Sequence, residues 1–271
     1  MDGFNCQLGP VVERSAYAGT ASGKPRARKM RLHDTIARQL GIAIVSGRHA
    51  PGHLLDNEIA SSERLAVSRT AYREAVRILA AKGLVTARPK VGTRVNPQSE
   101  WTLLDLEVLD WVFESAPDRR LLNNLFELRK VVECAAAGLA ARRRSKAHLL
   151  AMRSALERMA QHTLATGPGR QADLDFHRAL LDATQNPFVV SLTSVVSAVI
   201  ATTNVIKQRE RPLRRDPIPD HARVLEAIQA RSEVRAQRAM RELIDLARLD
   251  TPARRTPRRL RARTARRRSR G

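Results

Sequence analysis

The stretch from Val67 to Val76 constrains the fold more than any other part of this 271-residue chain. Ser68 suits a helix N-cap, because its hydroxyl can accept a hydrogen bond from an unpaired N–H of the first turn. Polar, helix-compatible residues 58–65 precede the stretch, and an apolar row followed by residues 82–85 continues it. The pattern predicts a helix, a tight turn, a second helix and a short pair of strands.

Arg69, Thr70 and Arg73 fall on the first turns of the predicted second helix. Arg69 and Arg73 are four residues apart and therefore share one face. Two arginines and a threonine at the start of a helix can read base edges and grip phosphates in a DNA major groove. A solvated basic face on an ordinary helix is the alternative, and the spacing alone favours neither reading.

A β-hairpin is expected directly after this helix. Residues 84–88 and 92–95 are β-prone and flank a turn with Lys90 at its tip, and Gly92 allows a close approach to a sugar-phosphate backbone. An amphipathic helix over residues 31–45, with apolar residues every four positions, precedes the whole unit. The candidate DNA-contacting residues are Ser68, Arg69, Thr70, Arg73, Lys90 and Gly92.

The charge balance indicates a polyanionic partner. The chain has 49 Lys and Arg against 27 Asp and Glu, a formal net charge of +22. Ten of the arginines lie in residues 251–271, which contain no acid, and subtracting these ten charges from +22 leaves +12. This excess favours nucleic acid as the partner. It also leaves open a general nucleic-acid-binding protein that acts through its arginine tail.

Composition favours a helical, cytoplasmic protein. Apolar residues make up 43% of the chain but aromatic residues only 3%, which favours helices packed through aliphatic side chains. Cys6 and Cys134 form no disulfide framework or CxxC metal site, as expected in a reducing cytosol. The longest apolar run, residues 188–206, is broken by Ser, Thr and Asn, and the N-terminus has no signal-peptide core. We therefore expect no membrane partner.

The predicted architecture is mainly α-helical, with a winged helix–turn–helix followed by an antiparallel helical bundle. Gly167-Pro168-Gly169 is expected to break the chain, residues 188–209 to form one central helix, Pro212, Pro217 and Pro219 to form a loop, and Asp220 to cap the next helix. The expected segments are a disordered extension over 1–29, the winged helix–turn–helix over 30–96, a linker with a helix over 97–118, an effector-binding and dimerisation domain over 119–250 and a disordered tail over 251–271.

The segments 43–47, 51–52, 67–70, 73–75, 82–85 and 92–95, in this order, resemble the winged helix–turn–helix of GntR-type transcriptional regulators. The C-terminal half resembles the helical FCD effector domain of the FadR subgroup. Its marks are Leu128-Arg129, Glu133, residues 139–141, residues 173–177, Asn186-Pro187 and His221. The resemblance covers roughly residues 31–249. It implies a homodimer that binds a palindromic operator on double-stranded DNA and responds to a small carboxylic acid.

Two regions refine this resemblance: the junction between the two domains, in residues 97–118, and the winged helix–turn–helix itself, called the DNA head below. Trp101, Asp105, Val108 and Trp111 are similar to the junction in regulators of galactonate and related sugar-acid operons, although two tryptophans that anchor a linker helix to the bundle explain the same pattern. Four positions depart from the family: Asp56 stands after Leu55 where a Pro is usual, Ile59 where some members carry a base-contacting Arg, Ser61 where a core Leu is usual, and Ala66 where a turn Gly is usual. Base reading should therefore depend on Arg69, Thr70 and Arg73.

Asp173 and His177 are four residues apart on one predicted helix and can hold one cation, and His221 could complete a set of three ligands. In the family a further His is the fourth ligand, and the matching position here is Leu243. Three ligands imply weaker binding of zinc, nickel or manganese, with open positions for water or a hydroxy acid. In a metal-free alternative the two histidines bind the effector directly.

Arg129 is the predicted clamp for the effector carboxylate, because a guanidinium grips a carboxylate through two parallel hydrogen bonds. A surface Arg paired with Glu133 is the alternative. The effector residues are thus Arg129, Asp173, His177 and His221. The resulting hypothesis is a ligand-switched repressor. A metal-dependent enzyme using Asp173, His177 and His221 is a rival, since non-haem iron enzymes use similar sets, but it leaves the winged helix unexplained.

Overall fold

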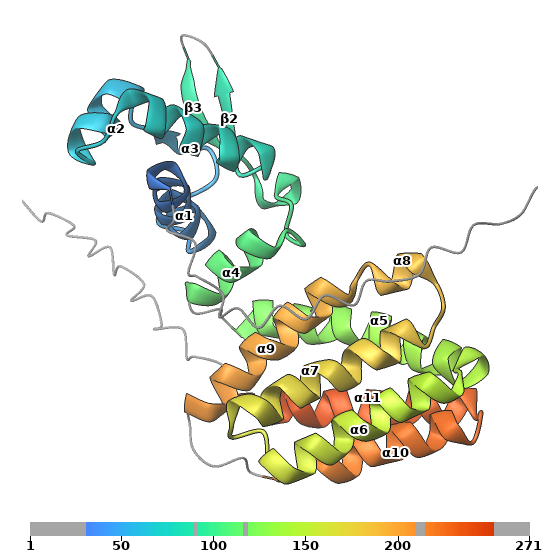
Figure 1. Ribbon diagram of the computed structural model, residues 1–271. Coiled ribbons are helices and arrows are strands. Elements are labelled where there is room, and N and C mark those ends of the chain that lie inside the picture. Colours follow the sequence, from blue (N-terminus) through green and yellow to red (C-terminus); the bar gives the residue numbers. More distant parts are fainter. Residues whose placement is uncertain (1–30, 89–90, 116–118, 210–214, 252–271) are drawn as a thin grey trace, which may run out of the picture. The chain divides into compact units, whose positions relative to one another are not determined.

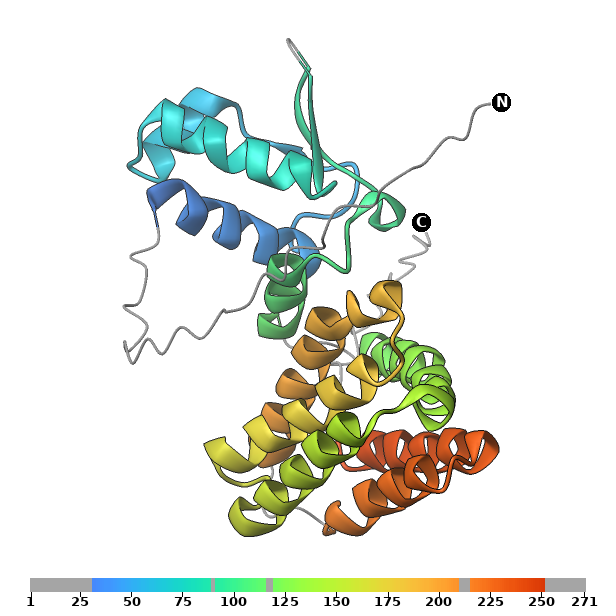
Figure 2. The same cartoon turned by 45° about the vertical axis from the view of Figure 1, so that its right-hand side comes forward.

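The computed structural model describes residues 31–88, 91–115, 119–209 and 215–251, apart from the side chains of 208 and 209. The described part is mainly α-helical, with one small sheet (Figures 1 and 2). The N-terminal elements are α1 (Leu32–Val45), β1 (Leu54–Leu55), α2 (Glu58–Arg64), α3 (Arg69–Ala81), β2 (Val85–Arg88) and β3 (Gly92–Val95). They are followed by the 3-10 turn η1 (Gln98–Glu100) and by α4 (Leu106–Glu114).

These N-terminal elements form the predicted winged helix–turn–helix. The sheet has the order β1-β3-β2, and both strand pairs are antiparallel. Helices α1 and α3 pack against each other through Ile36, Ile44, Tyr72 and Leu79, all of which are buried. The apolar spacing read from the sequence is therefore the spacing of a real core. The extension over 1–29 and the tip residue Lys90 lie outside the described residues.

The start of α3 confirms the predicted cap, since the Ser68 hydroxyl accepts a hydrogen bond from the backbone N–H of Ala71 at 3.2 Å. Two of the positions that depart from the family, Ser61 and Ala66, are accommodated locally. Ser61 is buried, and its hydroxyl donates to the backbone carbonyl of Asp56 at 3.2 Å. Ala66 has φ +51°, a left-handed conformation that costs a residue with a Cβ about 1–2 kcal/mol.

Helix α4 packs on the winged helix–turn–helix. Trp111 and Val108 belong to the same buried cluster as Ile44 and Leu79. A Cβ placed on Gly41 of α1 would overlap the Trp111 ring, so the indole packs directly on the backbone of Gly41. This contact surface on α1 is called the seat of Trp111 below. The expectation that the tryptophans anchor the linker helix to the bundle is therefore wrong for Trp111, whose seat is on α1.

The C-terminal part is the predicted antiparallel bundle, with a core of Ala, Leu, Val, Ile and Met side chains and two phenylalanines. Helices α5 and α11 lie side by side, as do α6 and α7 (Figure 1). The helices are α5 (Arg119–Arg143), α6 (Lys146–His162), α7 (Gly167–Asp182), α8 (Pro187–Val190), α9 (Thr193–Arg209), α10 (Ile218–Gln229) and α11 (Glu233–Leu249).

Two predicted helix starts in the bundle are wrong. Residues 167–169 do not break the chain but form the first turn of α7, which Thr166 caps. Pro219 likewise lies in the first turn of α10 rather than in a loop, and Pro217 rather than Asp220 is the N-cap. Proline and glycine are tolerated there because the N–H groups of a first turn have no partner within the helix.

The predicted central helix over 188–209 is interrupted between α8 and α9, and Asn186 caps α8. By length and composition alone, the segment Pro187–Lys207 is long and apolar enough to cross a membrane, and 28% of an 18-residue window within it is buried. Core helices of bundles have the same composition. On α9, Val196, Val199 and Ile200 are buried against neighbouring helices.

Candidate DNA-reading helix and effector site

The first turns of α3 present the predicted DNA-reading side chains to solvent. Arg69, Thr70 and Arg73 are all exposed, and Arg69 makes no hydrogen bond or ion pair with any residue that the structure describes. Arg73 differs, because its Nη2 donates to Oε1 of Glu58 at the start of α2, at 2.9 Å. The Arg69 guanidinium therefore has no partner within the described part of the chain, whereas that of Arg73 is already paired with Glu58.

In the hairpin, Gly92 opens β3 with φ +99° and is exposed. This backbone conformation is one that glycine adopts without strain, and the missing side chain leaves the strand open to a close neighbour. Arg88, paired with Gly92 across the hairpin, is also exposed. The sequence reasoning did not select Arg88, although its charge beside the predicted turn was a usable signal.

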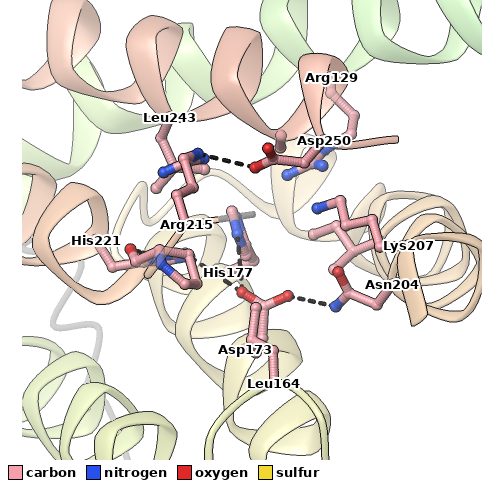
Figure 3. A pocket seen from close by; sticks show the side chains of 13 residues that line it. Arg129, Leu164, Asp173, His177, Asn204, Lys207, Arg215, His221, Leu243 and Asp250 are labelled. Atoms are coloured by element: carbon pink, nitrogen blue, oxygen red, sulfur yellow. Dashed lines mark hydrogen bonds and ion pairs between the residues drawn. The ribbon is translucent and has the colours of Figure 1, made fainter. Parts of the chain in front are cut away.

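The bundle brings the three candidate metal ligands together. Asp173 and His177 lie on α7, one turn apart, and His221 lies on α10. All three are buried, and one ligand atom from each lies within 4.8 Å of the others. Oδ1 of Asp173 is 3.1 Å from Nε2 of His221 and 3.7 Å from Nε2 of His177 (Figure 3).

The proton on His221 can be placed from its neighbours. Nδ1 lies 2.9 Å from the carbonyl oxygen of Pro217, which can only accept, so Nδ1 carries a proton. A neutral His221 then turns a bare Nε2 toward a carboxylate oxygen of Asp173. Two acceptors at this distance repel each other unless a proton or a cation lies between them. Nε2 of His221 indeed has no hydrogen-bond partner among the described residues, whereas Nδ1 of His177 lies against the carboxylate of Glu133.

Asn204 of α9 fixes the orientation of the Asp173 carboxylate. Its Nδ2 donates a hydrogen bond to Oδ2 of Asp173 at 2.6 Å, which leaves Oδ1 for the histidines. Burial by itself would raise the pKa of Asp173. The two histidines and Asn204 outweigh burial and hold this pKa well below its usual range. Asp173 is therefore an anion at neutral pH.

Arg129 lies in the wall of the same pocket, but it is already paired. Its Nε donates to Oε1 of Glu133 at 2.6 Å, and both side chains are buried. The carboxylate of Glu133 also contacts Nδ1 of His177. Burial would raise the pKa of Glu133, but Arg129 and His177 outweigh it and lower the pKa to about 2. The alternative was a surface Arg paired with Glu133. It is wrong about the location, because Arg129 is buried, but the i, i+4 ion pair that it predicted is present.

The pocket is small, with a volume of about 20 Å³. This is room for one water molecule or one metal ion, but not for an organic acid. Arg215 lies over it between two acids, Asp220 at the start of α10 and Asp250 at the end of α11 (Figure 3). Nε of Arg215 is 2.8 Å from Oδ2 of Asp250. A larger ligand can enter only if side chains such as these move.

Several residues of the pocket were missed by sequence reasoning. Asn204 and Lys207 are polar positions three apart in an apolar helix, which is a local signal that could have marked a polar site. Arg215 and Asp250 give no such signal, because only the packing of α10 against α11 brings them together. Leu243, which stands where the family resemblance implies a fourth ligand, lies in the pocket wall and is buried.

Comparison with known proteins gives the family. The model described as "Bacterial regulatory proteins, gntR family" matches residues 32–95, and the FCD domain model matches residues 124–246. The uncharacterized HTH-type transcriptional regulator YieP of Escherichia coli K12 is 32% identical over 184 residues, which cover 67% of this chain and 80% of that protein. The chain belongs to the GntR family of bacterial regulatory proteins.

Other relatives agree with this assignment. The galactonate operon transcriptional repressor of Escherichia coli K12 is 36% identical over 166 residues, covering 61% of this chain and 72% of that protein. A solved structure described as "Lar controls the expression of the Listeria monocytogenes agr system and mediates virulence" covers 82% of this chain and 97% of its own, with a TM-score of 0.54. At 16% identity it supports the fold alone.

This GntR-family chain is accordingly a DNA-binding transcriptional regulator with an FCD domain. Regulators of this type bind DNA operators and take small-molecule effectors in the FCD domain. Since the family and the named relatives are regulators, the rival reading of Asp173, His177 and His221 as an enzyme's metal centre is excluded.

Proposed function

We propose that this GntR-family regulator is a cytoplasmic repressor whose binding to a palindromic operator is weakened by a small carboxylate effector. A sugar acid such as galactonate is the first candidate for this effector. The observation that carries the proposal is the buried cluster of Asp173, His177 and His221 in a chain whose helix α3 exposes Arg69, which has no partner among the described residues. The similarity to a galactonate operon repressor supports the choice of ligand class.

A divalent metal, zinc, nickel or manganese, fits the cluster. The support is the bare Nε2 of His221 facing Oδ1 of Asp173, which a cation would turn from repulsion into two bonds. Asn204 and Pro217 would orient these ligands from behind, as outer partners do in metal sites. Leu243 offers no fourth ligand, so such a cation would supply positive charge with open positions for the oxygens of a hydroxy acid.

We infer that the repressor acts as a homodimer, so that two copies of α3 read two half-sites related by a two-fold axis. Exposed apolar side chains of the FCD domain support this, notably Phe188, which is 83% exposed, and Val205, which is 43% exposed. A change of Phe188 to Glu should lower the dimer fraction measured by light scattering, whereas Leu150→Glu, at another exposed apolar position, should not.

Effector control requires that the ligand has a different affinity for the DNA-competent and the DNA-incompetent forms. The test is a gel shift on DNA from upstream of the protein's own gene, with and without aldonates and matched hydroxy acids. We expect galactonate or a related acid to weaken binding, and His221→Gln to keep DNA binding but lose the response. If no acid weakens binding of the wild-type protein, the effector part of the proposal fails.

A second arm separates operator reading from general binding through the arginine tail. A chain lacking residues 251–271 should keep its preference for the upstream DNA over random DNA of equal length. Binding through the tail alone would instead disappear with the tail, and it would show steep salt dependence with little sequence preference.

A further inference from the structure

The cationic side chains in the pocket wall differ in whether a carboxylate already binds them. Arg129 is held by Glu133, and Arg215 is held between Asp220 and Asp250. Lys207 has no hydrogen bond and no ion pair with any residue that the structure describes. Of these three cations, Lys207 is therefore the one whose charge is not already bound by a carboxylate.

Lys207 is placed to meet a ligand. It lies one helical turn after Asn204 on α9, so both side chains share the face that lines the pocket. In Figure 3 its amine points into the pocket, and it lies on the opposite side from His221, with Asp173 between them. A ligand held at the Asp173, His177 and His221 end could therefore extend toward Lys207.

The surroundings of Lys207 call for an anion. Lys207 is partly buried, and burial lowers its pKa to about 8, while the charge of Asp173 acts in the opposite direction. The amine is therefore still mostly protonated at pH 7. Asp173 does not bind it, because Asn204 takes Oδ2 and the histidines face Oδ1. A partly desolvated cation without a bonded partner is costly, and a ligand anion would remove that cost.

We propose that Lys207 binds a second acidic group of the effector, so that the pocket prefers a dicarboxylate to the monocarboxylate of the same length. One carboxylate lies at the Asp173, His177 and His221 end, where the divalent cation proposed for that cluster would offset the charge of Asp173, and the other pairs with the Lys207 amine. A lysine amine is a compact point charge that accepts a carboxylate from many directions, so the contact sets ligand charge more than ligand shape. This inference rests on the proposed effector role of the pocket.

The experiment compares two acids that differ only at the far carbon: galactarate, with a carboxylate there, and galactonate, with a hydroxymethyl group. Their affinities are measured by calorimetry on the full chain, for the wild type, for Lys207→Met and for the surface control Lys146→Met. We expect galactarate to bind the wild type about tenfold or more tightly than galactonate. Lys207→Met should remove this preference through weaker galactarate binding, with galactonate changed less than about threefold, and Lys146→Met should change neither.

The outcomes separate this inference from the proposed function. If both acids bind equally well, or if Lys207→Met weakens both equally, Lys207 does not read a second carboxylate, although the regulator still takes a sugar acid. If neither acid binds the wild-type protein, the sugar-acid proposal and this inference both fail. A thermal melt of Lys207→Met without ligand shows whether that variant is folded, and Lys207→Gln provides a second, polar replacement with the same expected result.

Discussion

Nδ2 of Asn204 lies 2.6 Å from Oδ2 of Asp173, and this one hydrogen bond decides which carboxylate oxygen faces His177 and His221. Loss of the amide would let the carboxylate rotate away from the histidines. We therefore expect Asn204→Leu to weaken binding of a divalent cation by about 10–100-fold, as is common for outer partners of metal ligands. Titration with Zn²⁺ or Mn²⁺ checks this, with Thr203→Val as the neighbouring control. An unchanged affinity would show that Asn204 does not orient a metal ligand.

Asp250 is expected to compete with the effector for the pocket. Its carboxylate binds Arg215 across the small cavity and stabilises the closed arrangement. Asp250→Asn keeps the shape of the side chain but removes its charge, so the closed form should be less favoured and the apparent effector affinity should rise by about 3–10-fold. Asp245→Asn, on the same helix but paired with Lys130, should have no such effect. A weaker affinity in Asp250→Asn would mean that Asp250 supports binding.

Glu133 should make stability depend on acidic pH. Its pKa is about 2 in the folded chain and 4.5 as a free side chain. A lowered pKa gives stability that is present above pH 4.5 and is lost as the pH falls from 4.5 toward 2. Urea unfolding should show the wild type losing on the order of 3 kcal/mol more than Glu133→Gln across this window. The variant starts from a lower stability, because Arg129 loses its partner. Parallel curves for the two proteins would contradict the assignment.

Ala66 offers a stabilising change in the DNA head. Its φ of +51° is strained for alanine and relaxed for glycine. After the extra freedom of glycine in the unfolded chain is allowed for, Ala66→Gly should raise the free energy of unfolding by roughly 0.5–1 kcal/mol. Ala80→Gly, in the regular helix α3, should lower it by about 1 kcal/mol. Thermal melts show whether each substitution raises or lowers the stability. A lower stability of Ala66→Gly would contradict the inference that the backbone at Ala66 is strained.

Arg69 should carry base recognition. Arg69→Ala should cost about 1–3 kcal/mol of operator binding and relax specificity at one base position. Arg77→Ala removes an equal charge from the same helix, but Arg77 is paired with Glu74, so its effect should be small and insensitive to sequence. Binding to a panel of single-base operator variants makes the comparison. Equal weakening by Arg69→Ala across the whole panel would instead mark a phosphate contact.

Local features of this fold were predictable, because their causes are local. Ser68 could be identified as a cap from its side chain and the apolar row that follows it, and Asp173 and His177 share a face because they are four residues apart. Residues 167–169 were misread because Gly and Pro are breakers inside a helix but acceptable in its first turn. The capping Thr166 is the residue that distinguishes the two cases.

The rest of the pocket depends on contacts between segments far apart in the sequence. His221 was selected through the family resemblance and not through its own spacing. Asn204 reaches Asp173 across 31 positions, and Arg215 reaches Asp250 across 35, so no periodicity could pair them. Arg129 shows the same limit, since sequence placed Glu133 beside it but could not tell that both would be buried.

The seat of Trp111 on Gly41 also bears on how such regulators can be recombined. The indole of α4 fills the space that a side chain at Gly41 would need, so the two positions can change only together. A chimera that joins this DNA head to a foreign effector domain at Asn96 would leave the seat empty and expose the surface of α1. A crossover after Glu114 keeps the pair intact. The modular unit for protein engineering is thus the winged helix–turn–helix together with its linker helix.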